Sequence, residues 1–490
     1  MPSTPACKRN WDKPMKRTGT ILSFLLLLFI ESSFAQLQPL RVSDNRHFLV
    51  TRDGRPFFWL GDTGWELFHH LDRQDAERYF STRAAQGFTV IQAAALAELD
   101  GLHTTNAKGD LPLLHDDPLQ PNEAYFAWVD TLIDLAAKYH LYIGLLPTWG
   151  DKLFKDSWGK GPEIFNTDNA FAYGKWLASR YRNRTNIIWI LGGDRDPREN
   201  SGDLAVWRSM AAGINTGAGG PDHALITFHP QPKARGSSSL WFQKDDWLGL
   251  NMLQTGHCRD TPVWDIVNDD YNRQPAKPVF NGECIYEEMP VCFNAKELGY
   301  ANAYDVRKAA WLSVFAGAFG HTYGCGPVIW FSEKKDNLFA ALHTWKEGLD
   351  LPAAGEMKYL RALIESRPML DRIPDQSLLA DTGGCPAERI QAIRGKDYAF
   401  IYSAYGRPII VNTERIAGRQ LNAAWYDPRT GQTTFFRSFE NKGQQTFIPP
   451  LPAASPVPSQ REDWVLILDD AAKAYPAPAS PVPASPTPGK

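Results

Sequence analysis

Short apolar runs alternate with longer amphipathic segments along the first 370 residues of the chain. Each apolar run has the length of a β-strand, whereas the segments between them repeat apolar positions with a helical period. We predict one strand ending near Asp62 and others at 88–96, 141–149, 186–193, 224–230, 247–254, 278–283 and 320–324. The predicted helices are 72–87, 122–140, 169–182, 203–214, 263–273, 303–318 and 353–366.

Strands that are apolar over most of their length and alternate with helices are typical of a parallel sheet buried on both faces. Eight such units predict an α/β protein with a (β/α)8 TIM barrel at residues 36–370. A short hairpin turned at "RDG", residues 52–54, is expected to lead into the first strand. A doubly wound open sheet is the alternative fold. It is less favoured because no glycine-rich dinucleotide fingerprint follows the first strand.

The pattern changes near residue 375, where short strand-like pieces separated by turn residues begin. The sequence "DPRTG" at 427–431 lies between two apolar runs and favours a hairpin turn. We therefore predict a small antiparallel β-sandwich at 375–470. The last segment, 471–490, is rich in proline, alanine and serine, which predicts an extended, disordered tail.

The first 35 residues have the features of an export signal. Basic residues precede an apolar run at 21–30, and "SFA" precedes Gln36. This run is too short to span a bilayer comfortably, so we expect cleavage after Ala35 and no membrane association of the mature protein. The protein is accordingly expected to be exported, either periplasmic or secreted. An uncleaved N-terminal anchor is the alternative.

Composition narrows the function classes. The net charge is −3 and no basic patch stands out, which argues against binding of nucleic acid. The 17 tryptophans suit a large core, but flat indole faces also bind sugars. The cysteines form no CxxC pair, and no metal or nucleotide motif is present, so neither a metal nor another cofactor is expected. Cys284 and Cys292 are candidates for a disulfide in an oxidising compartment.

Two acidic residues follow predicted strands at positions where barrel enzymes carry their chemistry. Asp194 comes after the fourth strand in "IIWILGGD", and Glu283 ends the seventh in "PVFNGE". A pair of carboxyl groups with separated pKa values is what cleavage of a glycosidic bond requires. Asp196 competes with Asp194, and Glu287 competes with Glu283. If the strand persists that far, residues 283 and 287 share parity, so strand alternation does not separate them. A single acidic residue at a strand end is more often a helix cap or part of an ion pair.

Several motifs together resemble the apiosidase-like glycoside hydrolases, family 140. They are "FFWLGDTGWELFHHL", "GFTVIQ", "IIWILGGDRDP", "ITFHP" and "KPVFNGECIYEEMP", and the resemblance covers residues 40–469. It implies a barrel followed by a small β-sandwich of the collagen-binding type, which we interpret as structural. It also implies exo-acting removal of β-linked apiose from galacturonic acid in rhamnogalacturonan II. By the same resemblance, Asp194 is the general acid/base and Glu283 the nucleophile of a retaining mechanism.

The mouth of the predicted barrel offers further candidates for contact with a plant cell-wall polysaccharide or oligosaccharide. They are Asp62, Trp65, Trp149, His229, Gln254, His257, Tyr286, Glu287, His321 and Tyr323. Each has a structural alternative, such as a core tryptophan or a satisfied interior histidine. Another plant cell-wall glycosidase (an arabinofuranosidase, a galactosidase or an endoglycanase) fits the same barrel, because loops set the pocket. A non-catalytic carbohydrate-binding or adhesion protein is the third reading.

Overall fold

The computed structural model describes residues 37–232, 236–333, 341–450 and 463–479. The predicted signal peptide lies outside these residues. The described chain begins with a three-stranded antiparallel sheet of β1 (Leu40–Val42), β2 (Leu49–Thr51) and β3 (Pro56–Phe57). The predicted hairpin is confirmed: β2 and β3 pair around a turn in which Gly54 has a φ of 86°, a left-handed conformation that favours glycine.

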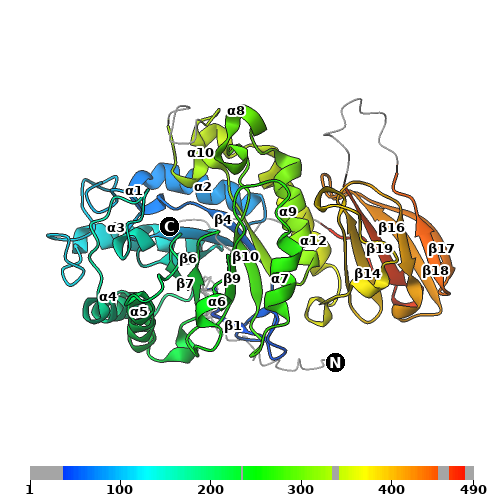
Figure 1. The fold of residues 1–490 in the computed structure, drawn as a ribbon, viewed down its shortest axis with the longest axis horizontal. Helices are drawn as coiled ribbons and strands as arrows, with labels where there is room; N and C mark the ends of the chain where they lie inside the picture. Colours follow the sequence, from blue (N-terminus) through cyan, green and yellow to red (C-terminus); the bar gives the residue numbers. More distant parts are fainter. Residues whose placement is uncertain (1–36, 233–235, 334–340, 451–462, 480–490) are drawn as a thin grey trace, which may run out of the picture. The chain divides into compact units, whose positions relative to one another are not determined.

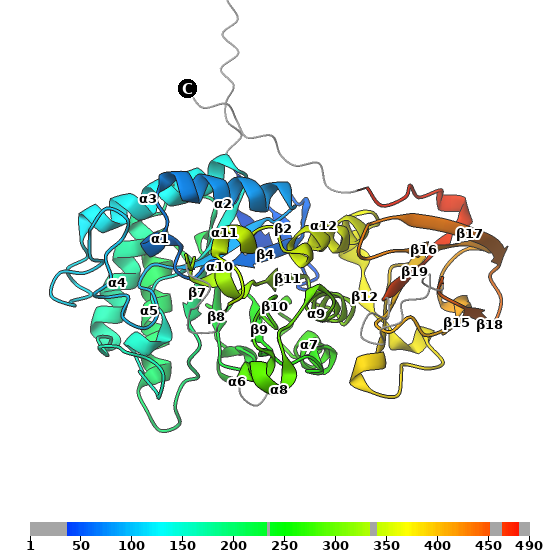
Figure 2. The ribbon, with the colours of Figure 1, turned by 90° about the horizontal axis from the view of Figure 1, so that it is seen from above.

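Eight parallel strands form the central sheet, in the order β8-β7-β6-β5-β4-β11-β10-β9 (Figures 1 and 2). The gap between β8 and β9 is bridged by a 2.8 Å hydrogen bond from Gly249 N–H to Ile226 O, so the barrel is nearly closed. The prediction of a (β/α)8 barrel is confirmed. Its strands are β4 (Trp59–Thr63), β5 (Val90–Ala94), β6 (Tyr142–Leu146), β7 (Ile187–Gly192), β8 (Ile226–His229), β9 (Asn251–Gln254), β10 (Val279–Glu283) and β11 (Gly320–Tyr323).

The main helices lie outside the strands (Figure 2). Side chains of Asp72, Asn122, Asn166 and Asn302 each accept a backbone N–H in the first turn of a helix, which fixes where those helices begin. The longer helices are α2 (Arg73–Ala85), α3 (Glu123–Lys138), α4 (Thr167–Arg180), α5 (Asp203–Ala218), α7 (Val263–Tyr271), α9 (Ala303–Phe315) and α12 (Pro352–Glu365). The short ones are α1 (Leu67–His70), α6 (Ser239–Phe242), α8 (Ala295–Leu298), α10 (Gly326–Ile329) and α11 (Trp345–Gly348).

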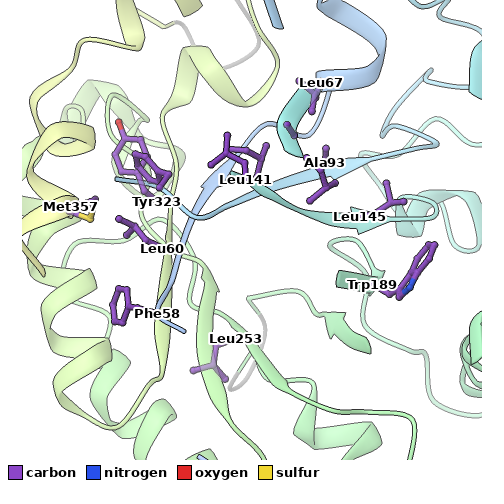
Figure 3. Close-up of a cluster of buried hydrophobic side chains, with 14 of the residues drawn as sticks. Phe58, Leu60, Leu67, Ala93, Leu141, Leu145, Trp189, Leu253, Tyr323 and Met357 are labelled. Carbon is purple, nitrogen blue, oxygen red and sulfur yellow. The ribbon is translucent and has the colours of Figure 1, made fainter. Parts of the chain in front are cut away.

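Side chains of most barrel strands alternate between two buried clusters. On β4, Trp59 packs in the barrel interior, whereas Leu60 belongs to the larger cluster between strands and helices. Figure 3 shows this outer cluster, with Leu60, Ala93, Leu145 and Trp189 among its members. The strands are therefore apolar on both faces, which explains their continuous hydrophobic runs.

The C-terminal region is built from antiparallel strands, as predicted. Six strands form one sheet in the order β12-β13-β14-β19-β16-β17, and β15 pairs with β18. The "DPRTG" turn joins β16 to β17, with Gly431 N–H donating to Asp427 O at 2.8 Å. The strands are β12 (Ile373–Pro374), β13 (Ile390–Arg394), β14 (Tyr398–Ser403), β15 (Ile409–Asn412), β16 (Gln420–Tyr426), β17 (Thr433–Glu440), β18 (Gln444–Phe447) and β19 (Trp464–Asp470).

Only part of the predicted tail falls in the described chain. Within residues 471–479, Tyr475 donates its hydroxyl to Asp397 at 2.8 Å, and Pro476 O accepts from Arg367 at 3.0 Å. These contacts hold the start of the segment in place. Residues 480–490 lie outside the described residues.

The candidate disulfide between Cys284 and Cys292 is not the one that forms. Cys292 is bonded to Cys258 instead, with the two Cα atoms 4.7 Å apart. Cys284 is fully buried beside the barrel, where its Sγ lies 3.4 Å from His321 Nε2. The loop after β10 folds back onto the loop after β9, which brings Cys292 to Cys258 instead of to the nearer residue in sequence, Cys284.

Candidate active site

Glu283 is aimed into the barrel mouth by an irregularity in β10. The register shifts between Asn281 and Glu283, so that Glu283 pairs with Gln254 on β9. Asn281 faces the helices, donating to Ser313 Oγ at 3.1 Å, and Gly282 has no side chain that would collide with Met252. A bulge of this kind re-aims a side chain and is common beside active sites. Glu283 consequently points inward, although simple alternation from Asn281 would turn it outward.

Two histidines hold the Glu283 carboxylate. His229 Nε2 lies 2.7 Å from Oε2, and His257 Nε2 lies 3.3 Å from Oε1. Burial by itself would raise the pKa of Glu283, but the hydrogen bonds from the two imidazoles outweigh it and lower the pKa to about 2. The Tyr286 hydroxyl also lies close to this carboxyl group. Glu283 is thus an ionised carboxylate at neutral pH.

Asp194 follows β7 in an unusual backbone conformation. Gly192, Gly193 and Asp194 all have positive φ, at 83°, 109° and 54°. This turn directs the Asp194 backbone N–H to His229 Nδ1 at 3.0 Å. Because Nδ1 accepts this hydrogen bond, the proton of the neutral ring is on Nε2. The Nε2–H group therefore donates a hydrogen bond to Glu283. His229 therefore connects the backbone of one carboxylic residue with the side chain of the other.

The environment of Asp194 favours its protonated form. Burial and then the negative charge of Glu283 raise the pKa of Asp194 to about 7, against smaller opposing effects of His229, Arg195 and Gln254. The Asp194 side chain is 21% exposed, compared with 7% for Glu283, so Asp194 remains reachable from the mouth. The two carboxyl groups thus have the separated pKa values that distinguish an acid from a nucleophile.

Arg195 fixes the loop that carries Asp194. Its guanidinium donates to the backbone oxygens of Phe154, Asp194 and Lys155 at 2.7–2.9 Å, and it stacks on the Trp158 ring at 4.2 Å. The Asp194 carboxylate is more distant, at 3.8 Å. Arg195 is therefore mainly a loop anchor, and it offsets only part of the rise in the Asp194 pKa.

Aromatic rings line the same part of the barrel. Trp65 lies 5.0 Å from Trp149 and 5.4 Å from His229, measured between ring centroids. Trp149 Nε1, Gln254 Oε1 and His257 Nδ1 are buried and have no hydrogen-bond partner among the described residues. Buried polar atoms normally have a partner, so these three unsatisfied atoms are exceptions that gather around Glu283 and Asp194.

Four of the predicted site residues point away from this centre. Asp62 is fully buried and accepts from Arg83 Nε at 2.7 Å and from Tyr79 OH at 2.5 Å, both on α2. Tyr323 donates to Glu287 at 2.7 Å, and Glu287 also accepts from the Ala353 N–H of α12. Asp62 and Tyr323 face the helices because they occupy outward positions of β4 and β11, and Glu287 lies in the loop that follows β10. His321 likewise lies outside the barrel interior, beside Cys284.

The competing residue Asp196 has a structural contact. Its Oδ1 accepts the backbone N–H of Gln231 at 2.8 Å, which joins the loop after β7 to the loop after β8. The structure thus brings together Asp194, Glu283, His229, His257, Gln254, Tyr286, Trp65 and Trp149 from the predicted set.

Glu98 is a site residue that the sequence reading missed. Its Oε1 accepts from Trp330 Nε1 at 2.5 Å. Burial raises the pKa of Glu98 to about 8, with the negative charges of Asp194, Asp151 and Glu283 adding to the rise. Glu98 follows the second strand by only a few residues, so the strand-end rule that selected Asp194 could also have found it.

An eight-stranded barrel that carries an acid and an ionised carboxylate at its mouth defines a glycoside hydrolase. A solved structure described as a glycoside hydrolase is 34% identical over 90% of this chain and 98% of its own, with a TM-score of 0.80. A family 5 glycoside hydrolase from Bacteroides vulgatus is 31% identical over 91% of this chain and 96% of its own, with a TM-score of 0.81.

The family model of the apiosidase-like catalytic domain matches residues 43–371, and the chain therefore belongs to the apiosidase-like family. A collagen-binding-like domain model matches residues 373–469. No curated protein matches the sequence.

No helix in the described part of the chain has the length and hydrophobicity to cross a bilayer. Among the same residues, no group of three or more His, Cys, Asp and Glu side chains could hold a metal ion.

Proposed function

We propose that this protein is an exported, exo-acting β-apiosidase that removes apiose from galacturonic acid in the side chains of rhamnogalacturonan II. The observation that supports the reaction is that the pKa values of one carboxyl pair are shifted in opposite directions. The pKa of Asp194 is raised to about 7, and the pKa of Glu283 is lowered to about 2. Family membership supports the choice of sugar. The substrate is a fragment of plant cell-wall pectin.

The proposed mechanism retains the anomeric configuration. Asp194 donates its proton to the glycosidic oxygen while the Glu283 carboxylate attacks the anomeric carbon. The bond between this carbon and the glycosidic oxygen breaks, galacturonic acid leaves with the proton, and a glycosyl ester forms on Glu283. Asp194, now ionised, accepts a proton from water, and the hydroxide attacks the anomeric carbon. The ester bond breaks, and apiose and the Glu283 carboxylate are released.

Sugar analysis after incubation with rhamnogalacturonan II fragments tests the proposal. We expect the wild-type enzyme to release apiose as the only monosaccharide, and Asp194→Asn and Glu283→Gln each to lower kcat by at least about a thousandfold. Release of arabinose or galactose, or of oligosaccharides alone, would instead assign another glycosidase activity. Binding of the fragments without release of any sugar would contradict the catalytic proposal.

Rescue with azide tests the assignment of the two roles. With an activated aryl β-apioside, azide should take the place of the nucleophile in Glu283→Ala and give a glycosyl azide of inverted configuration. In Asp194→Ala, azide should attack the glycosyl ester and give a product of retained configuration. The opposite pattern would exchange the roles of the two residues, and rescue in neither variant would argue against a retaining mechanism.

Export is part of the proposal and is tested separately. The apolar run at 21–30 and the small residues before Gln36 support cleavage after Ala35. Protein recovered from the periplasm or the medium should begin at Gln36. Retention of the intact N-terminus in the membrane fraction would support the anchor alternative.

A further inference from the structure

The loop at residues 290–294, after β10, is attached to the residue that supports the nucleophile. Cys292 is disulfide-bonded to Cys258, and its backbone N–H donates to His257 O at 2.9 Å. The loop is also closed internally, because Phe293 N–H donates to Pro290 O at 3.0 Å. A covalent bond and backbone hydrogen bonds therefore hold this loop against the end of β9.

The position of the loop places it at the active site. His257 precedes the disulfide-bonded Cys258, and its Nε2 lies 3.3 Å from Glu283 Oε1. The His257 ring is 4.6 Å from the ring of Tyr286 and 5.4 Å from that of Phe293, the latter at an interplanar angle of 84°. Phe293 is thus separated from the nucleophile by a single imidazole.

Phe293 has two costly features that the barrel core does not require. It is 61% exposed, although the aromatic rings around Glu283 are buried. Its φ is 59°, and that of Cys292 is 50°, which places two adjacent non-glycine residues in the left-handed region. For a bulky residue this conformation is rare, and such backbone strain is concentrated at functional sites.

We propose that Phe293 forms an additional sugar-binding subsite, in which its ring stacks on the galacturonic acid residue from which apiose is cleaved. This inference rests on the proposed exo-acting function, because in an exo enzyme only the leaving side of the cleaved bond carries further sugars. The exposed ring offers a flat apolar surface that suits the C–H face of a sugar. The disulfide holds this surface rigidly, which reduces the entropy lost on binding.

Calorimetric titration with trigalacturonate, which represents the leaving side alone, tests the subsite. We expect the wild-type enzyme to bind this probe, and Phe293→Ala to bind it about 3- to 10-fold more weakly, the range for loss of one aromatic contact. Phe293→Tyr should retain the affinity, because the ring is kept. Cys258→Ser with Cys292→Ser should also weaken binding, because the loop is released.

Phe435 on β17 offers a matched control. It is the same residue type and is 59% exposed, but it lies in the C-terminal sheet region. Phe435→Ala should leave the affinity for trigalacturonate unchanged. Equal weakening by both alanine variants would overturn the proposal, since it would show that any exposed phenylalanine has the same effect.

Kinetics separate this inference from the proposed function. With apiosyl oligogalacturonides, Phe293→Ala should raise KM by the same factor as the dissociation constant of trigalacturonate. If the wild-type enzyme releases apiose but does not bind trigalacturonate, or if Phe293→Ala binds it normally, the subsite is refuted and the proposed function stands. If no apiose is released from any substrate, the proposed function fails, and with it the assignment of galacturonic acid to this subsite.

Discussion

His229 donates its Nε2–H to Glu283 Oε2 at 2.7 Å, which makes a neutral imidazole the closest hydrogen-bonding support of the proposed nucleophile. The other ring nitrogen accepts the backbone N–H of Asp194 at 3.0 Å. One side chain from the end of β8 therefore fixes the relation between the ends of β7 and β10.

Activity should depend on pH as a bell-shaped curve. The reaction needs Glu283 ionised and Asp194 protonated, and the pKa values of the pair are about 2 and about 7. Since the Glu283 pKa is lowered, activity should be high already near pH 4 and be lost as pH rises through about 7. Measurement of kcat/KM between about pH 2 and 9 covers both limbs and checks this. A rate that stays constant up to pH 9 would contradict the assignment of Asp194 as the acid.

His229→Phe should lower kcat/KM and shift the acid limb of the pH–rate profile. Phenylalanine keeps a ring beside Trp65 and Trp149 but removes the donor to Glu283 and the acceptor for Asp194 N–H. We expect kcat/KM to fall roughly a hundredfold, the scale for loss of one preorganised donor. The acid limb should move to higher pH, because the pKa of Glu283 rises when a hydrogen bond to its ionised form is lost.

The exposed His223 gives a control for this substitution, and His223→Phe should behave as the wild type. An unchanged acid limb in His229→Phe would show that His229 acts only through packing.

Asp62→Asn should destabilise the protein without affecting the chemical step. Asp62 and Arg83 form a fully buried ion pair, and loss of one charge leaves the other without compensation. The cost is about 3–5 kcal/mol in the free energy of unfolding. Denaturant titration should show this loss, whereas kcat/KM at low temperature should stay near the wild-type value. Normal stability combined with a raised KM would instead indicate that Asp62 contacts the substrate.

Glu287→Gln should leave catalysis nearly unchanged and so separate the two acidic residues near β10. Burial raises the pKa of Glu287 to about 7, and its carboxyl group is occupied by Tyr323 and the Ala353 N–H. Glutamine keeps the shape of the side chain: its amide oxygen can accept the Ala353 N–H, and its NH2 group can donate to the Tyr323 hydroxyl oxygen. We expect kcat to change less than about threefold, compared with the thousandfold loss in Glu283→Gln. Similar losses in both variants would reopen the choice of nucleophile.

The disulfide should be found between Cys258 and Cys292. Mass analysis of peptides from the non-reduced protein should identify this linkage, and a Cys284–Cys292 peptide would contradict the structure. Cys258→Ser opens a loop that spans 34 residues of sequence separation. The chain-entropy model gives a loss of about 3–4 kcal/mol for a loop of this length, measured as the free energy of unfolding. A paired Cys258→Ser/Cys292→Ser variant controls for an unpaired thiol.

The local alternation of hydrophobic runs and amphipathic segments was sufficient to identify the strands and main helices of the barrel. A strand buried on both faces must be apolar along its length, and a helix that covers it must have one apolar side, so the signal lies within each segment. The same local logic placed Asp194 and Glu283 at strand ends. It could not choose between Glu283 and Glu287, because the two positions share the same strand alternation and only the folded chain shows that β10 ends at Glu283.

The sequence by itself thus determined the order of elements, the barrel class and the edge at which acidic residues gather. Only the tertiary structure decided that Asp62, Glu287, His321 and Tyr323 face the helices, that Cys292 pairs with Cys258, and that His229 joins the two carboxylic residues. These features depend on contacts between residues distant in the chain, and a pKa is set by burial and neighbouring charges, which exist only once the barrel has closed.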